Sequence, residues 1–174
     1  MDEDVIDRRV YSSFGLFSQS EVAFDDIEGR IKEIIGQGEG PRVEFKRELN
    51  REKRNEYLES IVAFANSRGG LLIIGVNDSG EVVGFEEDIE ELLTNQVHEL
   101  CSPSIDFTVK SDIKIEGKEI AVVDVPSGNQ KPYLLQGRGY IRRGATDRIM
   151  KREELEKLFD SDKSGLNPYF FYPK

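Results

Sequence analysis

Three short segments between residues 44 and 80 decide how this chain folds: EFK at 44–46, AFANSRGG at 63–70 and IGVNDSG at 74–80. In order, they predict a strand, the end of an amphipathic helix, a glycine turn, a buried strand and a polar turn. Charged side chains occur only where the strands emerge. The pattern therefore predicts a carboxylate, a lysine and an aspartate on one rim of a sheet.

The flanking sequence extends this pattern into an α+β fold. Apolar residues at helical spacing predict helices at 25–35, ended by Gly36, and at 55–67, 88–100 and 151–159. Alternating or continuous apolar runs predict strands at 42–46, 71–76, 81–85, 105–109, 120–125 and 139–142. We expect a single compact domain at 25–160 with a mixed, mostly antiparallel sheet and packed helices. Residues 1–24 would form an N-terminal extension and residues 161–174 a C-terminal tail.

The composition is that of a soluble globular protein, with 37% apolar and 33% charged residues among 174. No apolar run approaches the roughly 20 residues that a membrane-spanning helix needs. The acidic N-terminus is unlike a secretory signal. One cysteine and one histidine exclude a disulfide framework and a zinc site built from Cys and His alone. We therefore expect a cytoplasmic protein.

The net charge of −10 disfavours nucleic acid as a partner, because an acidic protein repels phosphate. The charge is unevenly distributed, however. Residues 77–99 hold eight acidic side chains and no lysine or arginine, whereas residues 131–152 hold seven basic side chains against Asp147 alone. Charges act over about 8–10 Å at physiological salt. The basic segment therefore still allows a nucleic-acid surface.

Glu39, Glu44 and Asp78 are the candidate metal ligands. If the two predicted strands are neighbours, these carboxylates gather within reach of one Mg²⁺ or Mn²⁺ ion, which prefers oxygen ligands. Such an ion can generate a hydroxide nucleophile. Lys46, on the same strand face as Glu44, suits a phosphate. The alternative is that Glu44 and Lys46 form a solvated ion pair and that Asp78 forms a turn.

Lys46, Lys131, Tyr140, Arg142 and Arg143 are the candidate contacts to nucleic acid. Residues two apart on a strand share a face, so Tyr140 and Arg142 place a ring beside a guanidinium. An exposed pair of this kind is a platform for an unpaired base and a phosphate. Lys131 repeats the combination of a cation and an aromatic residue in a long loop. The alternative is an edge strand charged for solubility, with Tyr140 packed against the core.

Other nucleotide and nucleophile chemistries find no support. No phosphate-binding loop of the Gly-x-x-x-x-Gly-Lys-Ser/Thr type is present, so ATP binding has no motif. Gly69-Gly70 precedes its strand, whereas the glycine loop of a dinucleotide-binding domain follows one. His98 is expected at the surface of a helix, away from any nucleophile.

Together these motifs resemble the Schlafen-type AlbA-like (AlbA_2) domain over residues 28–159. The resemblance implies a compact domain that binds DNA or RNA and that often accompanies a winged-helix regulatory domain in bacteria and archaea. This chain is too short for that second domain and looks like a stand-alone version. The matching segments, in the family's order, are 38–40, 43–46, 63–70, 74–80, 131–133 and 140–144.

The resemblance also implies an enzymatic alternative. Animal Schlafen proteins include RNA endonucleases that cleave transfer RNA with a Glu, Glu, Asp trio, and Glu39, Glu44 and Asp78 occupy similar positions. Those nucleases pair two lobes, so this chain would need to be a homo-oligomer and to hold Mg²⁺ or Mn²⁺. We rank a nucleic-acid-binding module first and this endoribonuclease second. A third hypothesis is an interaction domain in which the acidic helix from Asp88 to Glu99 recruits a basic partner.

Overall fold

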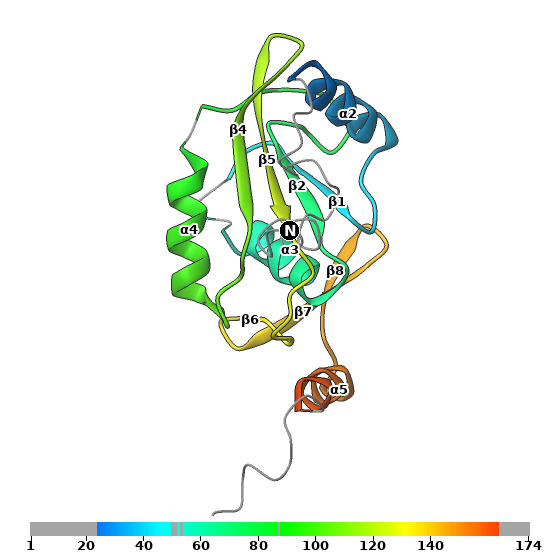
Figure 1. Cartoon of the computed structure of the whole chain (residues 1–174), viewed down its shortest axis with the longest axis vertical. Coiled ribbons are helices and arrows are strands. Elements are labelled where there is room, and N and C mark those ends of the chain that lie inside the picture. The colour runs from blue at the N-terminus through cyan, green and yellow to red at the C-terminus, as the bar shows by residue number, and fades with distance from the viewer. Residues whose placement is uncertain (1–23, 50–51, 53, 87, 164–174) are drawn as a thin grey trace, which may run out of the picture.

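The computed structural model describes residues 24–49, 52, 54–86 and 88–163. The expected N-terminal extension, except Phe24, and the tail from residue 164 onwards lie outside these residues. The described part folds into two four-stranded sheets and four helices (Figure 1). The predicted α+β class, with mainly antiparallel sheets, is confirmed.

The main sheet supplies the rim on which the candidate site lies. Its strands are β1 (Val43–Lys46), β2 (Gly70–Ile74), β5 (Lys118–Val125) and β4 (Thr108–Ile115), in that order across the sheet. β1 and β2 run parallel, with Glu44 opposite Leu72, and the other pairs are antiparallel. Every residue of β2 is buried, as its continuous apolar run predicts for a strand covered on both faces.

Helices cover both faces of this sheet. On one face, α2 (Phe24–Gln37) packs its isoleucines against Leu71 and Ile73 of β2. On the other face, α3 (Arg54–Asn66) and α4 (Ile89–Leu100) pack against Leu72 and Ile74. The strict alternation of β2 therefore divides the apolar core into two layers. None of the helices in the described ranges is both long enough and apolar enough to cross a bilayer.

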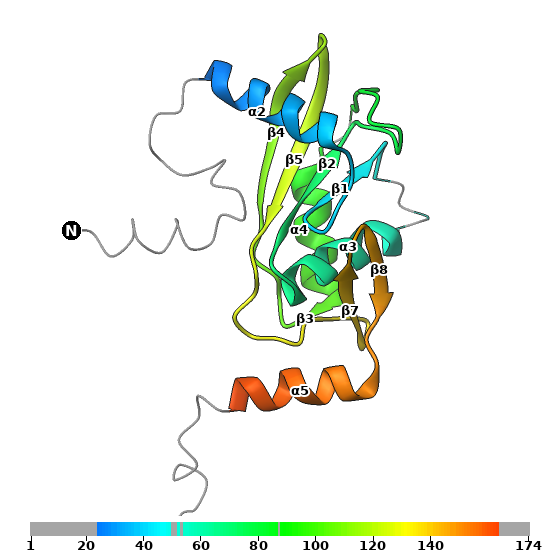
Figure 2. The same ribbon diagram turned by 90° about the vertical axis from the view of Figure 1, so that its right-hand side faces the viewer.

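The second sheet lies on the far side of α3 (Figure 2). It contains β3 (Cys101–Ser102), β6 (Leu134–Leu135), β7 (Arg138–Arg143) and β8 (Thr146–Ile149), paired antiparallel in that order. α3 is thus buried between two sheets. α5 (Arg152–Lys163) follows β8 and extends beyond the second sheet.

Several predicted boundaries are wrong for local reasons. The first helix continues through Gly36, because the left-handed glycine that ends it is Gly38, with φ 81° and its N–H bonded to the Ile35 carbonyl. The strand predicted at 105–109 corresponds to β4, which begins only at Thr108. Thr108 pairs with Asp124, close to the end of β5, so β5 is too short to pair with all of residues 105–107. In place of the strand predicted at 81–85, Val82 alone pairs, in an isolated bridge with Val76. β8 was not predicted.

Candidate functional site

β1 is an edge strand, and groups from outside the sheet satisfy its outer side. The N–H of Phe45 donates to Oε1 of Glu39 at 2.9 Å. Gly40 and Val43 exchange backbone hydrogen bonds of 3.0 and 3.4 Å. The Arg142 guanidinium donates to both of their carbonyl oxygens, at 2.8 Å to Gly40 and 3.0 Å to Val43. We call these contacts the β1 edge cap.

Arg142 also lies at the centre of a buried ion-pair network. Its side chain is 2% exposed and donates to Glu44 at 2.8 Å and to Asp147 at 3.0 Å. The other Glu44 oxygen accepts from Lys46 Nζ at 2.6 Å. The other Asp147 oxygen accepts from the Ser60 hydroxyl at 2.7 Å. A single guanidinium thereby joins β7 of the second sheet to β1 of the main sheet.

The expected exposed platform of Tyr140 and Arg142 is not formed. Both residues share one face of β7, as predicted, but that face turns inward, and they are only 6% and 7% exposed. The guanidinium lies 5.1 Å from the centroid of the Phe64 ring, within cation–π range. Burial and a hydrogen bond to Glu59 raise the pKa of Tyr140 above its usual value. These two side chains therefore pack inside the fold and do not form an exposed platform.

Two of the predicted carboxylates, Glu44 and Asp78, lie close enough to the third, Glu39, to affect its pKa. Burial is the main reason that the pKa of Glu39 is raised. The hydrogen bond from Phe45 opposes that rise, while the negative charges of Glu44 and Asp78 add to it. Asp78 itself is exposed in the turn after β2. Strands β1 and β2 are neighbours, as predicted, and Glu44 and Asp78 lie close enough to Glu39 to affect its pKa.

Coupling does not make this trio a metal site. Both oxygens of Glu44 already accept from the cations Lys46 and Arg142, so a metal ion would compete with two bound cations. Across the described ranges, no group of three His, Cys, Asp or Glu side chains is placed to hold a metal ion. As arranged here, Glu39, Glu44 and Asp78 do not fit Mg²⁺ or Mn²⁺.

Three basic residues lie on or beside the segments that meet at Ser67, the residue that follows α3. Lys131 Nζ donates to the Ser67 carbonyl at 2.7 Å, and burial lowers the pKa of this lysine. The backbone N–H of Arg142 donates to the Ser67 hydroxyl at 3.1 Å. Arg143 is the next residue along β7. Arg68, next in the chain, is exposed. The Arg143 side chain is 64% exposed and pairs with Glu154 at 3.4 Å. We call Arg68, Lys131 and Arg143 the basic surface.

Asn66 is the residue that sequence reasoning missed most clearly. Its amide nitrogen donates to the carbonyls of Tyr133 at 2.8 Å and Tyr140 at 2.9 Å. Its amide oxygen accepts from the Tyr133 N–H at 2.7 Å. Asn66 thereby fixes the loop that carries Lys131, and also β7, to the end of α3. A polar residue at the end of an almost wholly buried helix was the signal that could have found it.

Comparison with known proteins identifies the class of domain that this fold and this network define. The chain belongs to the Schlafen, AlbA_2 family, whose model matches residues 39–151. The resemblance noted from the motifs is therefore confirmed.

Individual relatives are more distant. An uncharacterized ATP-binding protein of Ureaplasma parvum serovar 3, UU034, is 28% identical over 151 residues, covering 70% of this chain and 42% of the relative. This chain thus spans less than half the length of that protein.

Two solved structures share the fold. The DIP2311 protein of Corynebacterium diphtheriae superposes with a TM-score of 0.56 at 20% identity, covering 79% of this chain and 29% of that one. The other is the N-terminal domain of a protein from Nitrosomonas europaea related to the ATP-dependent DNA helicase RecG. It superposes with a TM-score of 0.50 at 24% identity, covering 72% of this chain and 95% of that domain.

Proposed function

We propose that this domain binds nucleic acid through the basic surface, with Lys46 as a further phosphate contact. The observation that carries the proposal is the position of Arg68, Lys131 and Arg143 on or beside the segments that meet at Ser67, in a chain whose net charge is −10. Cations at the C-terminal end of α3 also suit the helix dipole. The helicase-related name of one fold neighbour is consistent with such a partner.

Phosphate contacts of this kind have a measurable consequence. Each neutralised phosphate releases counterions, so the logarithm of the binding constant falls linearly with the logarithm of the salt concentration. Each contact adds about 0.7 to the steepness of that slope for single strands and about 0.9 for duplex DNA. Tyr140 and Arg142 contribute indirectly, because they fix the strand that carries Arg143. Removing an exposed cation should therefore change the salt slope, whereas loosening the buried network should change stability.

Fluorescence anisotropy with labelled single-stranded RNA and duplex DNA tests the proposal. We expect the double variant Lys131→Gln, Arg143→Gln to bind more weakly and to lower the salt slope by about 1.4–1.8. The matched control is Arg30→Gln with Lys32→Gln, which removes the same charge from exposed positions on α2. Equal losses in both double variants would attribute binding to net charge alone and would refute the basic surface.

A metal-dependent endoribonuclease is the second candidate function. It requires Lys46 and Arg142 to release Glu44, so that this carboxylate can hold the ion together with Glu39 and Asp78. The effect of Glu44 and Asp78 on the pKa of Glu39 favours it. Its test is incubation with transfer RNA with and without Mn²⁺. Cleavage that disappears in Glu44→Gln but persists in Glu90→Gln, an exposed carboxylate on α4, would support it. Equal residual cleavage in both would identify a contaminant.

Light scattering of the same samples would test the expected homo-oligomer.

A further inference from the structure

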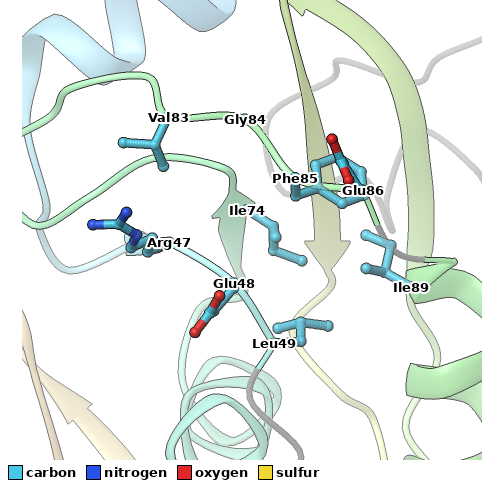
Figure 3. A pocket seen from close by; sticks show the side chains of 9 residues that line it. All are labelled: Arg47, Glu48, Leu49, Ile74, Val83, Gly84, Phe85, Glu86 and Ile89. Carbon is cyan, nitrogen blue, oxygen red and sulfur yellow. The ribbon is translucent and has the colours of Figure 1, made fainter.

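A pocket lies at the carboxyl ends of the parallel strands β1 and β2, away from the basic surface. Its volume is about 300 Å³. Arg47, Glu48 and Leu49 follow β1 directly, and Ile74 is the last residue of β2. The segment from Val83 to Glu86 and Ile89, the first residue of α4, complete the lining (Figure 3). The carboxyl ends of parallel strands are a frequent place for ligands.

The pocket has an apolar floor and a charged rim. Leu49, Ile74 and Ile89 form the floor, and each is at most 2% exposed. The half-buried Phe85 ring adds an aromatic wall. At the rim, Arg47, Glu48 and Glu86 are exposed. An apolar cavity with a few polar groups at its edge is the usual form of a small-ligand site, although about 300 Å³ is the lower end of that range.

We infer that this pocket receives one unstacked nucleobase of a bound single strand, with guanine preferred. The inference rests on the proposed nucleic-acid function and names the form in which the nucleic acid is held. A single flat ring system suits a small cavity with an aromatic wall, because unpaired bases stack on aromatic side chains.

The rim selects among the bases. A carboxylate has two acceptor oxygens and no donor. The Watson–Crick edge of guanine presents two neighbouring N–H donors, at N1 and N2, which Glu48 or Glu86 can accept together. Adenine, cytosine and uracil each offer a single donor group on that edge. Arg47 supplies a cation for the guanine carbonyl or for the adjoining phosphate.

The spacing of the two surfaces suits a short single strand. The loop from β1 to α3 carries Arg47 and Leu49, so the pocket lies towards the N-terminal end of α3. Lys131 of the basic surface contacts Ser67, just beyond the other end of that helix. α3 has 13 residues and spans about 20 Å at 1.5 Å per residue. A strand a few nucleotides long can place one base in the pocket and its phosphates on the basic surface.

Guanosine 5′-monophosphate, uridine 5′-monophosphate and ribose 5-phosphate, titrated into ¹⁵N-labelled protein, test the inference. We expect guanosine monophosphate to shift the amide signals of residues 83–86 and Ile89, and ribose 5-phosphate, which has no base, to leave them in place. Phe85→Leu, which keeps the apolar wall but removes the ring, should weaken binding. Glu48→Gln or Glu86→Gln should weaken it about tenfold, with Glu90→Gln as the matched control.

Two results would overturn the inference: shifts that map elsewhere, or equal affinity for guanosine monophosphate in Phe85→Leu and in both pocket glutamate variants. Its failure is separable from that of the proposed function. If RNA binding still depends on Lys131 and Arg143 while the pocket signals stay still, the basic surface stands and the pocket inference falls. If the mononucleotide occupies the pocket but the basic-surface variants bind RNA normally, the proposed function falls.

Discussion

Replacing Arg142 with methionine should destabilise the domain more than any change to an exposed cation. Methionine keeps an unbranched apolar stem beside Phe64 but removes the charge and all the donors. Glu44 and Asp147 are then left without their shared cation. Glu44 is only 8% exposed, so its charge cannot turn to water without movement of the strand.

The structure sets the size of this effect. Removing one partner of a buried ion pair costs about 3–5 kcal/mol. Here Glu44 keeps Lys46 and Asp147 keeps Ser60, so neither carboxylate is fully orphaned. We therefore expect the lower end, about 3 kcal/mol in the free energy of unfolding. For a domain of this size that corresponds to about 6–12 °C in Tm.

Urea unfolding followed by circular dichroism measures this change. Arg143→Met is the matched control, because the neighbouring side chain is 64% exposed, and it should change stability by less than about 0.5 kcal/mol. Arg142→Lys should recover only part of the loss, because one ammonium cannot reach the acceptors that the planar fork reaches. Equal stability of Arg142→Met and Arg143→Met would refute the network as a stabilising element.

Three further predictions concern other buried or paired groups. Asn66→Ala removes the partner of one N–H and two carbonyl groups, so the free energy of unfolding from urea titration should fall by about 2–4 kcal/mol; a change below 0.5 kcal/mol would argue against it. Burial raises the pKa of Cys101 to about 12, so a thiol reagent at pH 8 should label it only after unfolding, and rapid labelling of the native protein would be the contrary result. Arg148, helped by the Lys151 N–H, lowers the pKa of Glu154 to about 2. The resulting stabilisation is present above pH 4.5 and lost as pH falls towards 2, so the Tm advantage of the wild type over Glu154→Gln should shrink across that window in thermal melts.

The main sheet could be predicted because its strands show the pattern within a few consecutive residues. Val43 and Phe45 alternate with charged neighbours, and the run at 71–76 is apolar throughout. Residues 116 and 117 adopt positive φ in the turn between β4 and β5. In the second sheet only β7 was predicted, at 139–142. The other strands gave no such signal, because β3 and β6 have two residues each and β8 is mostly polar.

The candidate site could be predicted only in part. Local spacing correctly placed Glu44 with Lys46 and Tyr140 with Arg142 on shared faces. It could not show which face turns inward, because that depends on acceptors such as the Gly40 carbonyl, 102 positions from Arg142. The same long separation explains why Ser60 and Asp147 gave no sign of belonging to the network. Their meeting is a property of the tertiary fold.

The β1 edge cap has a consequence for the behaviour of the protein in a crowded solution. An open sheet margin invites β-augmentation by a neighbouring chain and, from there, aggregation. Glu39 occupies the outward N–H of Phe45, and Arg142 occupies the outward carbonyl of Val43, so an incoming strand meets donors and acceptors that are already engaged. Two side chains that looked suited to chemistry thus also keep neighbouring molecules from joining the sheet.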